Sequence, residues 1–237
     1  MENTIIHRAN TRGHADLGWL QASQSFSFGS YYNPDRMGFG ALRVLNDDVI
    51  AGEKGFGDHP HDNMEIITIP LEGALAHRDS LGSETVIRAG EVQVMSAGTG
   101  LYHSEYNHEE AAHAKSLQIW VYPNQRNVEP RYDQATIDTQ QRNILHQIIS
   151  PNAAEGGVWI YQDAWFSMGK FDAGRETTYE FKKSGNGVYI FVISGNLLVN
   201  GQELHPRDGM GIWNTTQLNI KANTDMEVLL MEVPMTY

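Results

Sequence analysis

The sequence contains no cysteine among its 237 residues. Disulfide bonds, thiolate nucleophiles and cysteine-ligated metal sites are therefore excluded, and the absence of cysteine is consistent with a cytoplasmic location. No run of eighteen apolar residues occurs, and the first ten residues, MENTIIHRAN, carry neither a basic segment nor a long apolar one. We therefore expect no membrane span and no secretory signal.

Basic residues are scarce. Lysine and arginine number 17 against 29 aspartates and glutamates, which gives a formal net charge of −12. A surface of this charge repels phosphate backbones, and no cluster of basic residues offsets it locally. Direct binding of nucleic acid is therefore not expected. The acidic surface leaves open a protein partner, and of the two simplest assembly states we favour a monomer over a dimer.

Long helical periodicity is also scarce, and short strand-like runs dominate. Runs of β-branched and aromatic residues recur between turn signals, as in EIITIPLEG, LQIWVYP, GVYIFVISG and EVLLMEVP. We predict turns at Asn46–Asp48, at Leu81–Ser83 and at Asn200-Gly201, the last as a two-residue hairpin turn. Such spacing predicts an all-β sandwich or barrel. The segment DQATIDTQQRNILHQIIS is the least strand-like interior stretch, and we predict a linker or a short helix there.

One pattern occurs twice in the chain, in residues 66–98 and 188–216. Each copy reads as an apolar strand ending in glycine, a second strand, a turn, another glycine and a further strand. Such a repeat predicts two similar β-barrels in tandem. We expect an N-terminal domain over residues 1–125, a linker over 126–145 and a C-terminal domain over 146–237.

Two pairs of metal-binding residue types stand out on either side of the first copy. His59 and His61 in DHPHDNMEI, and His103 and Glu105 in SAGTGLYHSEYN, are each separated by one residue. On a strand, residues i and i+2 point to the same face. Three imidazoles and a carboxylate would leave open positions on an octahedral ion, as metal catalysis requires. Glu65, with the same parity as His61, is the alternative carboxylate. The alternative is that these residues are merely polar residues on the surface. That alternative would have to account for two such pairs on either side of one hairpin, so we favour a metal site.

The second copy of the repeat provides an internal comparison. Aligning the two copies places Phe181 and Lys183 opposite the first pair, and Ala222 and Thr224 opposite the second. None of these four side chains is a usual metal ligand, so we expect the metal in the N-terminal barrel alone. We expect His77, near the end of another strand, to hydrogen-bond to a turn rather than bind metal.

These residues resemble the two cupin motifs. The first motif matches His59, His61, Glu65 and Gly73, and the second matches Gly90, Gly98, His103 and Asn107. Ser96 replaces the usual proline, and two extra residues precede the third histidine. With these departures, the strings GFGDHPHDNMEIITIPLEG, HRDSLG and MSAGTGLYHSEYN resemble the pirin family of bicupins over nearly the whole chain. The likeness is greatest to bacterial pirin-like proteins described as quercetin 2,3-dioxygenases.

The resemblance implies a ligand set and a reaction. The metal ligands would be His59, His61, His103 and Glu105, which moves the carboxylate away from Glu65. The ion would be Fe(II), with Zn, Ni, Cu, Co or Mn as alternatives, and the C-terminal cupin would hold none. A flavonol would bind through its 3-hydroxyl, Glu105 would accept that proton as catalytic base, and O₂ would open the ring with release of carbon monoxide.

Two other function classes stay open. The pirin family also includes a eukaryotic nuclear co-regulator of transcription, so a metal- or redox-sensing interaction protein is the competing class. A cupin enzyme that acts on another small aromatic metabolite is the third. Turnover of a flavonol to carbon monoxide separates the first class from the second.

Overall fold

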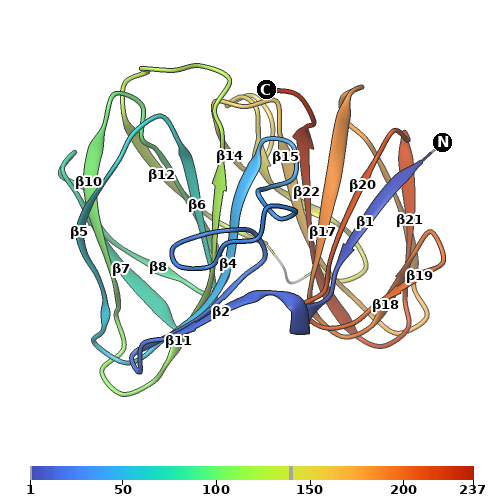
Figure 1. Ribbon diagram of the computed structural model, residues 1–237, viewed down its shortest axis with the longest axis horizontal. Coiled ribbons are helices and arrows are strands. Elements are labelled where there is room, and N and C mark those ends of the chain that lie inside the picture. Colours follow the sequence, from blue (N-terminus) through green and yellow to red (C-terminus); the bar gives the residue numbers. More distant parts are fainter. Residues whose placement is uncertain (1, 139–140) are drawn as a thin grey trace.

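The computed structural model describes residues 2–138 and 141–237. Within them, 22 strands and a single 3₁₀ turn, η1 (Ala9–Thr11), form two barrels that lie side by side (Figure 1). Each barrel combines a seven-stranded sheet with a four-stranded sheet. This arrangement confirms the predicted all-β bicupin fold. No helix of the described residues is long and apolar enough to cross a membrane.

The N-terminal barrel closes between a large and a small sheet. In order across it, the large sheet contains β12 (Arg131–Thr136), β9 (Glu91–Ser96), β6 (Glu65–Glu72), β11 (Ala114–Val121), β4 (Leu42–Ile50), β3 (Leu20–Gln24) and β2 (Gly13–Asp16). The small sheet contains β5 (Gly55–His61), β10 (Leu101–Asn107), β7 (Ala74–Asp79) and β8 (Glu84–Arg88).

The C-terminal barrel repeats this plan. Its large sheet contains β1 (Asn3–His7), β20 (Gly209–Trp213), β17 (Asn186–Ser194), β22 (Met226–Pro234), β15 (Trp165–Phe171), β13 (His146–Ser150) and β14 (Val158–Trp159). Its small sheet contains β16 (Glu176–Glu180), β21 (Gln217–Ala222), β18 (Leu197–Val199) and β19 (Gln202–Leu204). The run β17 to β20 takes the same sheet positions as the run β6 to β9. The predicted internal repeat is therefore confirmed.

The segment 133–150, predicted as linker or short helix, contributes strands at both ends. It contains most of β12, which pairs with β9 of the N-terminal barrel, and all of β13, which pairs with β15. Residues 139–140 lie outside the described residues. The error arose because β12 is polar on both faces: Arg131 pairs with Asp133 on one face, and Tyr132 hydrogen-bonds to Gln134 on the other. The domain limits themselves stay a prediction, and the first strand, β1, belongs to the C-terminal sheet.

The two large sheets pack face to face. Alternate residues of the central strands, such as Ile67, Ile69 and Leu117, meet Phe191 and Met231 in one buried hydrophobic core. Because side chains alternate along a strand, this contact buries one face of the N-terminal large sheet. The other face is left to line the inside of its own barrel.

The interiors of the two barrels differ in polarity. Tyr179, Leu218, Ile220 and Ala222, on the strands equivalent to β5 and β10, belong to an apolar cluster that fills the C-terminal barrel. The corresponding strands of the N-terminal barrel carry histidines and a glutamate inward. The polar interior therefore belongs to the barrel in which we predicted the metal site.

Two of the three predicted turns are confirmed. Asn200 and Gly201 have φ of 48° and 83°, as a two-residue hairpin turn requires, and residues 81–83 join β7 to β8. The turn at Asn46–Asp48 is wrong. These residues form the middle of β4, where Asn46 and Asp48 face the polar barrel interior. Asp47 faces the other way and pairs with Arg12 at 3.1 Å.

Candidate metal centre

Strands β5 and β10 bring three predicted ligands together. His59 stands opposite His103 in the antiparallel register, and His61 stands opposite Leu101. The ring centroids of His59 and His103 are 4.4 Å apart, and His61 is 4.9 Å from each. One nitrogen from each ring lies within 4.8 Å of the others. This triangle is the right size for three imidazoles to bind one ion.

The electrostatic setting keeps the rings of His61 and His103 neutral. Burial, helped by the rings of His59, His61 and His77, lowers the pKa of His103 to about 2. Burial and His59 lower the pKa of His61 to about 4. Nδ1 of His59 lies 2.8 Å from the carbonyl of Gly57, so as a donor it leaves Nε2 free for metal. Neutral imidazole is the form that binds transition metals.

His103 supplies a direct test of whether a metal fits. Its side chain is 2% exposed, and among the described residues neither ring nitrogen has a hydrogen-bond partner. Buried polar atoms are rarely left without a partner, so such a residue calls for an ion or water. The donor set of three imidazoles therefore fits a divalent transition metal.

Glu105, the predicted fourth ligand, lies beside His103 rather than within the histidine triangle. Its carboxylate oxygen is within 4.8 Å of nitrogens of His103 and His77. Thr68 donates to one carboxylate oxygen at 3.1 Å, and Gln118 donates to the other at 2.9 Å. Burial raises the pKa of Glu105 to about 7, although these hydrogen bonds oppose the rise. Each oxygen keeps a lone pair, so metal ligation by Glu105 stays a prediction that the geometry permits.

His77 lies closer to the centre than the sequence indicated. Its Nε2 pairs with Asp79 at 3.1 Å, and Asp79 in turn accepts from the backbone N–H groups of Leu81 and Ser83. This is the expected link to a turn. The ring also packs at a tilt against Tyr132 and lies 5.4 Å from the ring of His103, with Nδ1 unpartnered among the described residues.

Glu65, the alternative carboxylate, faces away from the centre. A turn at residues 62–64, with Asn63 at φ 47°, separates β5 from β6 and breaks the parity counted from His61. Glu65 pairs in register with Val121, whose side chain belongs to the core between the barrels. Its carboxylate accepts from Ser96 at 2.7 Å. Glu65 is thus a buried residue of the interface between the cupins.

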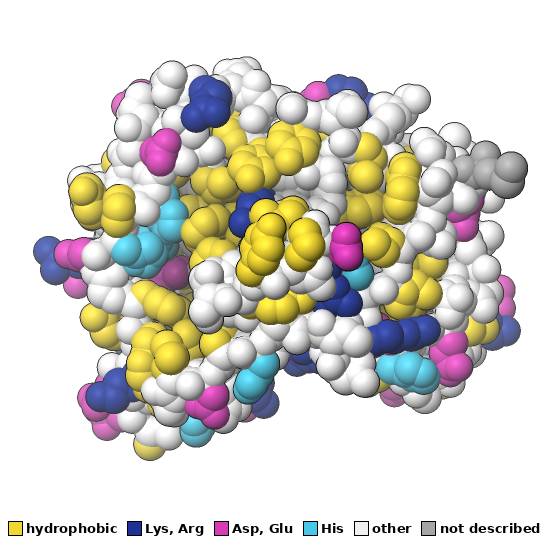
Figure 2. All heavy atoms as spheres, in the orientation of Figure 1, with side chains coloured by type: hydrophobic (Ala, Val, Ile, Leu, Met, Phe, Trp, Pro, Cys, Tyr) yellow, Lys and Arg dark blue, Asp and Glu magenta, His cyan; other side chains and the backbone are white. Residues whose placement is uncertain are grey.

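A cavity opens onto the three histidines. It measures about 490 Å³, and aromatic side chains form much of its wall: Trp19, Phe28, Phe56 and Trp120. Phe28 packs edge-to-face against Trp120 at 5.2 Å. The space-filling view shows histidines gathered beside hydrophobic side chains on the N-terminal half (Figure 2). This volume lies in the range of small-molecule sites, and its walls suit a planar aromatic ligand.

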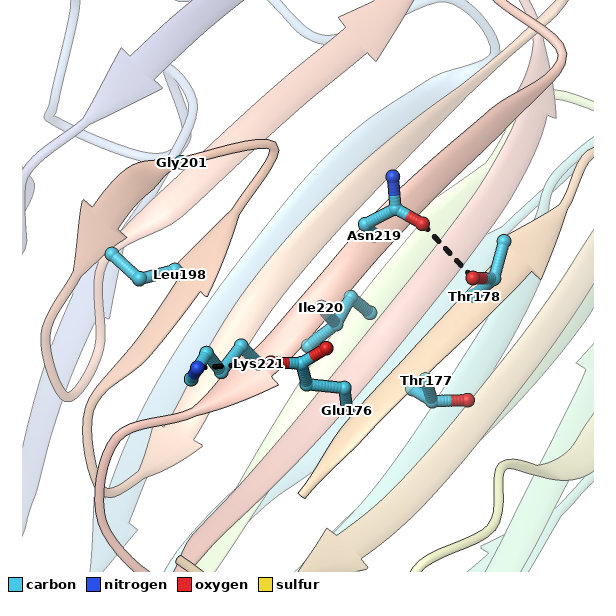
Figure 3. Close-up of a pocket in the computed structure, with 8 residues that line it drawn as sticks. All are labelled: Glu176, Thr177, Thr178, Leu198, Gly201, Asn219, Ile220 and Lys221. Atoms are coloured by element: carbon cyan, nitrogen blue, oxygen red, sulfur yellow. Dashed lines mark hydrogen bonds and ion pairs between the residues drawn. The ribbon is translucent and has the colours of Figure 1, made fainter. Parts of the chain in front are cut away.

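A second hollow lies on the outer face of the C-terminal small sheet. Lys221 pairs with Glu176 at 2.9 Å, and Thr178 donates to Asn219 at 2.9 Å (Figure 3). These four side chains are exposed and already satisfy one another. The hollow therefore lacks the buried, unpartnered groups that distinguish the cavity of the N-terminal barrel.

Comparison with known proteins agrees with this geometry. Residues 6–121 match the family model described as Pirin, and residues 147–233 match that of the quercetinase C-terminal cupin domain. The chain is 42% identical over 229 residues to quercetin 2,3-dioxygenase of Escherichia coli K12, covering 97% of this chain and 98% of that one. The chain belongs to the pirin family. The Pirin-like protein of Caulobacter vibrioides is 40% identical over 222 residues, covering 93% and 95%.

Solved pirin structures extend the likeness to the backbone. The crystal structure of YhhW from Escherichia coli superposes with a TM-score of 0.94 at 40% identity, covering 99% of this chain and 100% of that one. The same bacterial pirin in complex with nickel(II) gives a TM-score of 0.93 at 40% identity, covering 98% and 99%. A pirin relative thus binds a divalent transition metal, in agreement with the fit of the histidine triangle.

Proposed function

We propose that this pirin is a metal-dependent dioxygenase that opens the heterocyclic ring of quercetin-like flavonols and releases carbon monoxide. The observation that carries the proposal is the pairing of three clustered imidazoles, of which His103 is buried and His59 and His61 are half-buried, with an aromatic-walled cavity of about 490 Å³. Relatives that carry the name quercetin 2,3-dioxygenase support the reaction class. An acid-rich surface is compatible with an uncharged small-molecule substrate.

The metal would be held by His59, His61, His103 and Glu105, and we propose Fe(II) as the physiological ion. When bound, such an ion supplies a Lewis acid that orients the flavonol and O₂ in one site. His₃Glu sites accept several divalent ions, and the nickel-bound relative is one example.

Glu105 would accept the proton of the substrate 3-hydroxyl. A carboxylate is a suitable base when it is positioned and its pKa lies near the working pH, and burial raises the pKa of Glu105 to about 7. Thr68 and Gln118 fix the carboxylate from the opposite sheet. The hydrogen bonds of these two residues hold the accepting oxygens in one orientation before substrate arrives.

The aromatic walls would position the planar substrate. Trp19 packs against Phe56 at 5.3 Å, and Phe28 packs against Trp120 at 5.2 Å, so each wall residue has a fixed neighbour. Large flat side chains cover a flat ligand and exclude water from the reacting face.

The test is anaerobic loading with Fe(II), Ni(II) or Mn(II), addition of quercetin, and measurement of carbon monoxide after O₂ is admitted. We expect turnover in wild type, a loss of roughly 100-fold or more in Glu105→Gln, and near-normal rates in Glu65→Gln, the matched control at the interface. Metal-replete wild-type protein that releases no carbon monoxide would overturn the proposal. Normal release by Glu105→Gln would overturn the base assignment alone.

A further inference from the structure

A row of polar side chains crosses the inner face of the N-terminal large sheet. Side chains of directly opposed residues project from the same face of a sheet. Successive register partners on β3, β4, β11, β6, β9 and β12 are Gln24, Asn46, Gln118, Thr68, Gln93 and Gln134. The barrel wall opposite β5 and β10 is therefore built from amides and a hydroxyl, where a barrel filled for stability alone would carry apolar groups.

Several atoms of this wall are buried without a hydrogen-bond partner among the described residues. They include Oδ1 of Asn46 and, one pleat along β4, Oδ1 of Asp48. The two side chains are 4% and 5% exposed. Buried acceptors without donors are costly, and a cluster of them on the wall of a cavity indicates a missing donor.

On the large sheet, the unpartnered oxygen acceptors that line the cavity of the metal centre belong to Asn46 and Asp48. They belong to the large sheet, whereas the histidines belong to the small sheet. A ligand held at the histidines therefore has β4 on its far side. Gln118, between Asn46 and Thr68 in the row, is already committed to Glu105 at 2.9 Å. The free acceptors are thus separate from the groups assigned to proton transfer.

We propose that Asn46 and Asp48 form a hydroxyl-recognition subsite, which accepts hydrogen bonds from ring hydroxyls other than the one bound at the metal. The ligand class is a planar aromatic with several hydroxyl groups. This inference rests on the proposed flavonol site and deepens it.

The experiment compares quercetin with 3-hydroxyflavone, which has the metal-binding hydroxyl and no others. Affinities are measured anaerobically on Ni(II)-loaded protein by quenching of tryptophan fluorescence. Each hydroxyl bond is expected to contribute roughly 3- to 10-fold in affinity, so wild type should prefer quercetin by roughly 10-fold or more. Asn46→Leu and Asp48→Leu should each lower this preference by roughly 3- to 10-fold and leave the affinity for 3-hydroxyflavone unchanged.

Two further variants separate recognition from packing. Asp48→Asn keeps a carbonyl acceptor at the same place and should restore the preference that Asp48→Leu loses. Gln24→Leu removes the neighbouring amide of the same row, which does not line the cavity, and should leave the preference unchanged. Metal content is measured for every variant, so that a lost metal is not mistaken for a lost hydroxyl contact.

The outcomes distinguish this inference from the proposed function. Equal affinities for the two flavonols in wild type, or a preference unaltered in both leucine variants, would overturn the hydroxyl subsite and leave the dioxygenase proposal to its carbon monoxide test. A preference that depends on Asn46 and Asp48 without any carbon monoxide release would support the subsite and overturn the dioxygenase. Absence of binding by either flavonol would overturn both.

Discussion

His103→Leu should stabilise the metal-free protein. The His103 ring is 2% exposed and both its nitrogens lack partners among the described residues. A buried polar atom without a partner costs about 1–3 kcal/mol, and leucine removes both atoms while keeping most of the side-chain volume. After allowance for imperfect packing, we expect a net gain of about 2 kcal/mol in the free energy of unfolding. For a chain of this size that corresponds to a Tm rise of about 4 to 8 °C.

The assay is thermal unfolding at pH 8, with a chelator and then with Ni(II). Wild type should gain about 4 kcal/mol at a metal concentration 1,000 times its Kd, and His103→Leu should gain far less. The order of stability therefore reverses: the Tm of the variant is higher than that of wild type without metal and lower with metal. This reversal is expected only if His103 serves metal binding at a cost to the stability of the metal-free protein.

His113→Leu is the control. His113 lies exposed in the loop between β10 and β11, so its replacement should alter stability by less than about 0.5 kcal/mol. If His103→Leu lowers the Tm of chelated protein while His113→Leu does not, the His103 nitrogens are satisfied in the metal-free state. That result would refute the reasoning.

Three further predictions address other parts of the molecule. Glu65→Gln should retain full metal content, whereas Glu105→Gln should bind metal roughly 10-fold or more weakly. Competition with a chromophoric chelator measures both affinities, and equal losses would contradict the choice of Glu105 as the carboxylate ligand. Gly55→Ala should lower the free energy of unfolding in urea by roughly 1–3 kcal/mol, because an added Cβ would lie 2.1 Å from the carbonyl oxygen of Glu105 in the β5–β10 bulge. Gly57→Ala is the control and should not, because its Cβ would lie 3.6 Å from its nearest neighbour, the Tyr106 hydroxyl. Burial lowers the pKa of His7 to about 4. Below pH 6.5, His7 therefore binds a proton in the unfolded chain and stays neutral in the folded chain. The contribution of His7 to stability should then fall by up to about 1.4 kcal/mol per pH unit between pH 6.5 and 4. His7→Gln should reduce the slope of the wild-type curve by that amount, and an equal slope in the variant would contradict the lowered pKa of His7.

The fold could be predicted from the sequence because its signals are local. Strand alternation, positive-φ turns such as Asn200-Gly201 and the repeated glycine pattern each depend on neighbouring residues. These local signals identified the two barrels and the residue pairs His59/His61 and His103/Glu105. The pairing of β1 with the C-terminal barrel has no local signal, since it joins residues 3–7 to residues 209–213.

The parts of the site that sequence reasoning missed depend on context between strands. Asn46 and Asp48 have turn-like composition, and only the polar interior of the barrel makes them strand residues. Glu65 has the same parity as His61 when residues are counted along the sequence. The turn at Asn63 interrupts the strand, so the Glu65 side chain faces away from the histidines. The signal that could have found β4 was the run of apolar residues on both sides of Asn46–Asp48, which continues a strand through a polar centre.

The central claim is that the three histidines and Glu105 hold one divalent metal ion in the N-terminal cupin. Elemental analysis of protein purified without added metal, followed by titration with Fe(II) and Ni(II), tests it most directly. We predict about one ion per wild-type chain after titration and a large loss of binding in His59→Leu and His103→Leu. Wild-type protein that holds less than about a quarter of an equivalent and takes up no more on titration would contradict it.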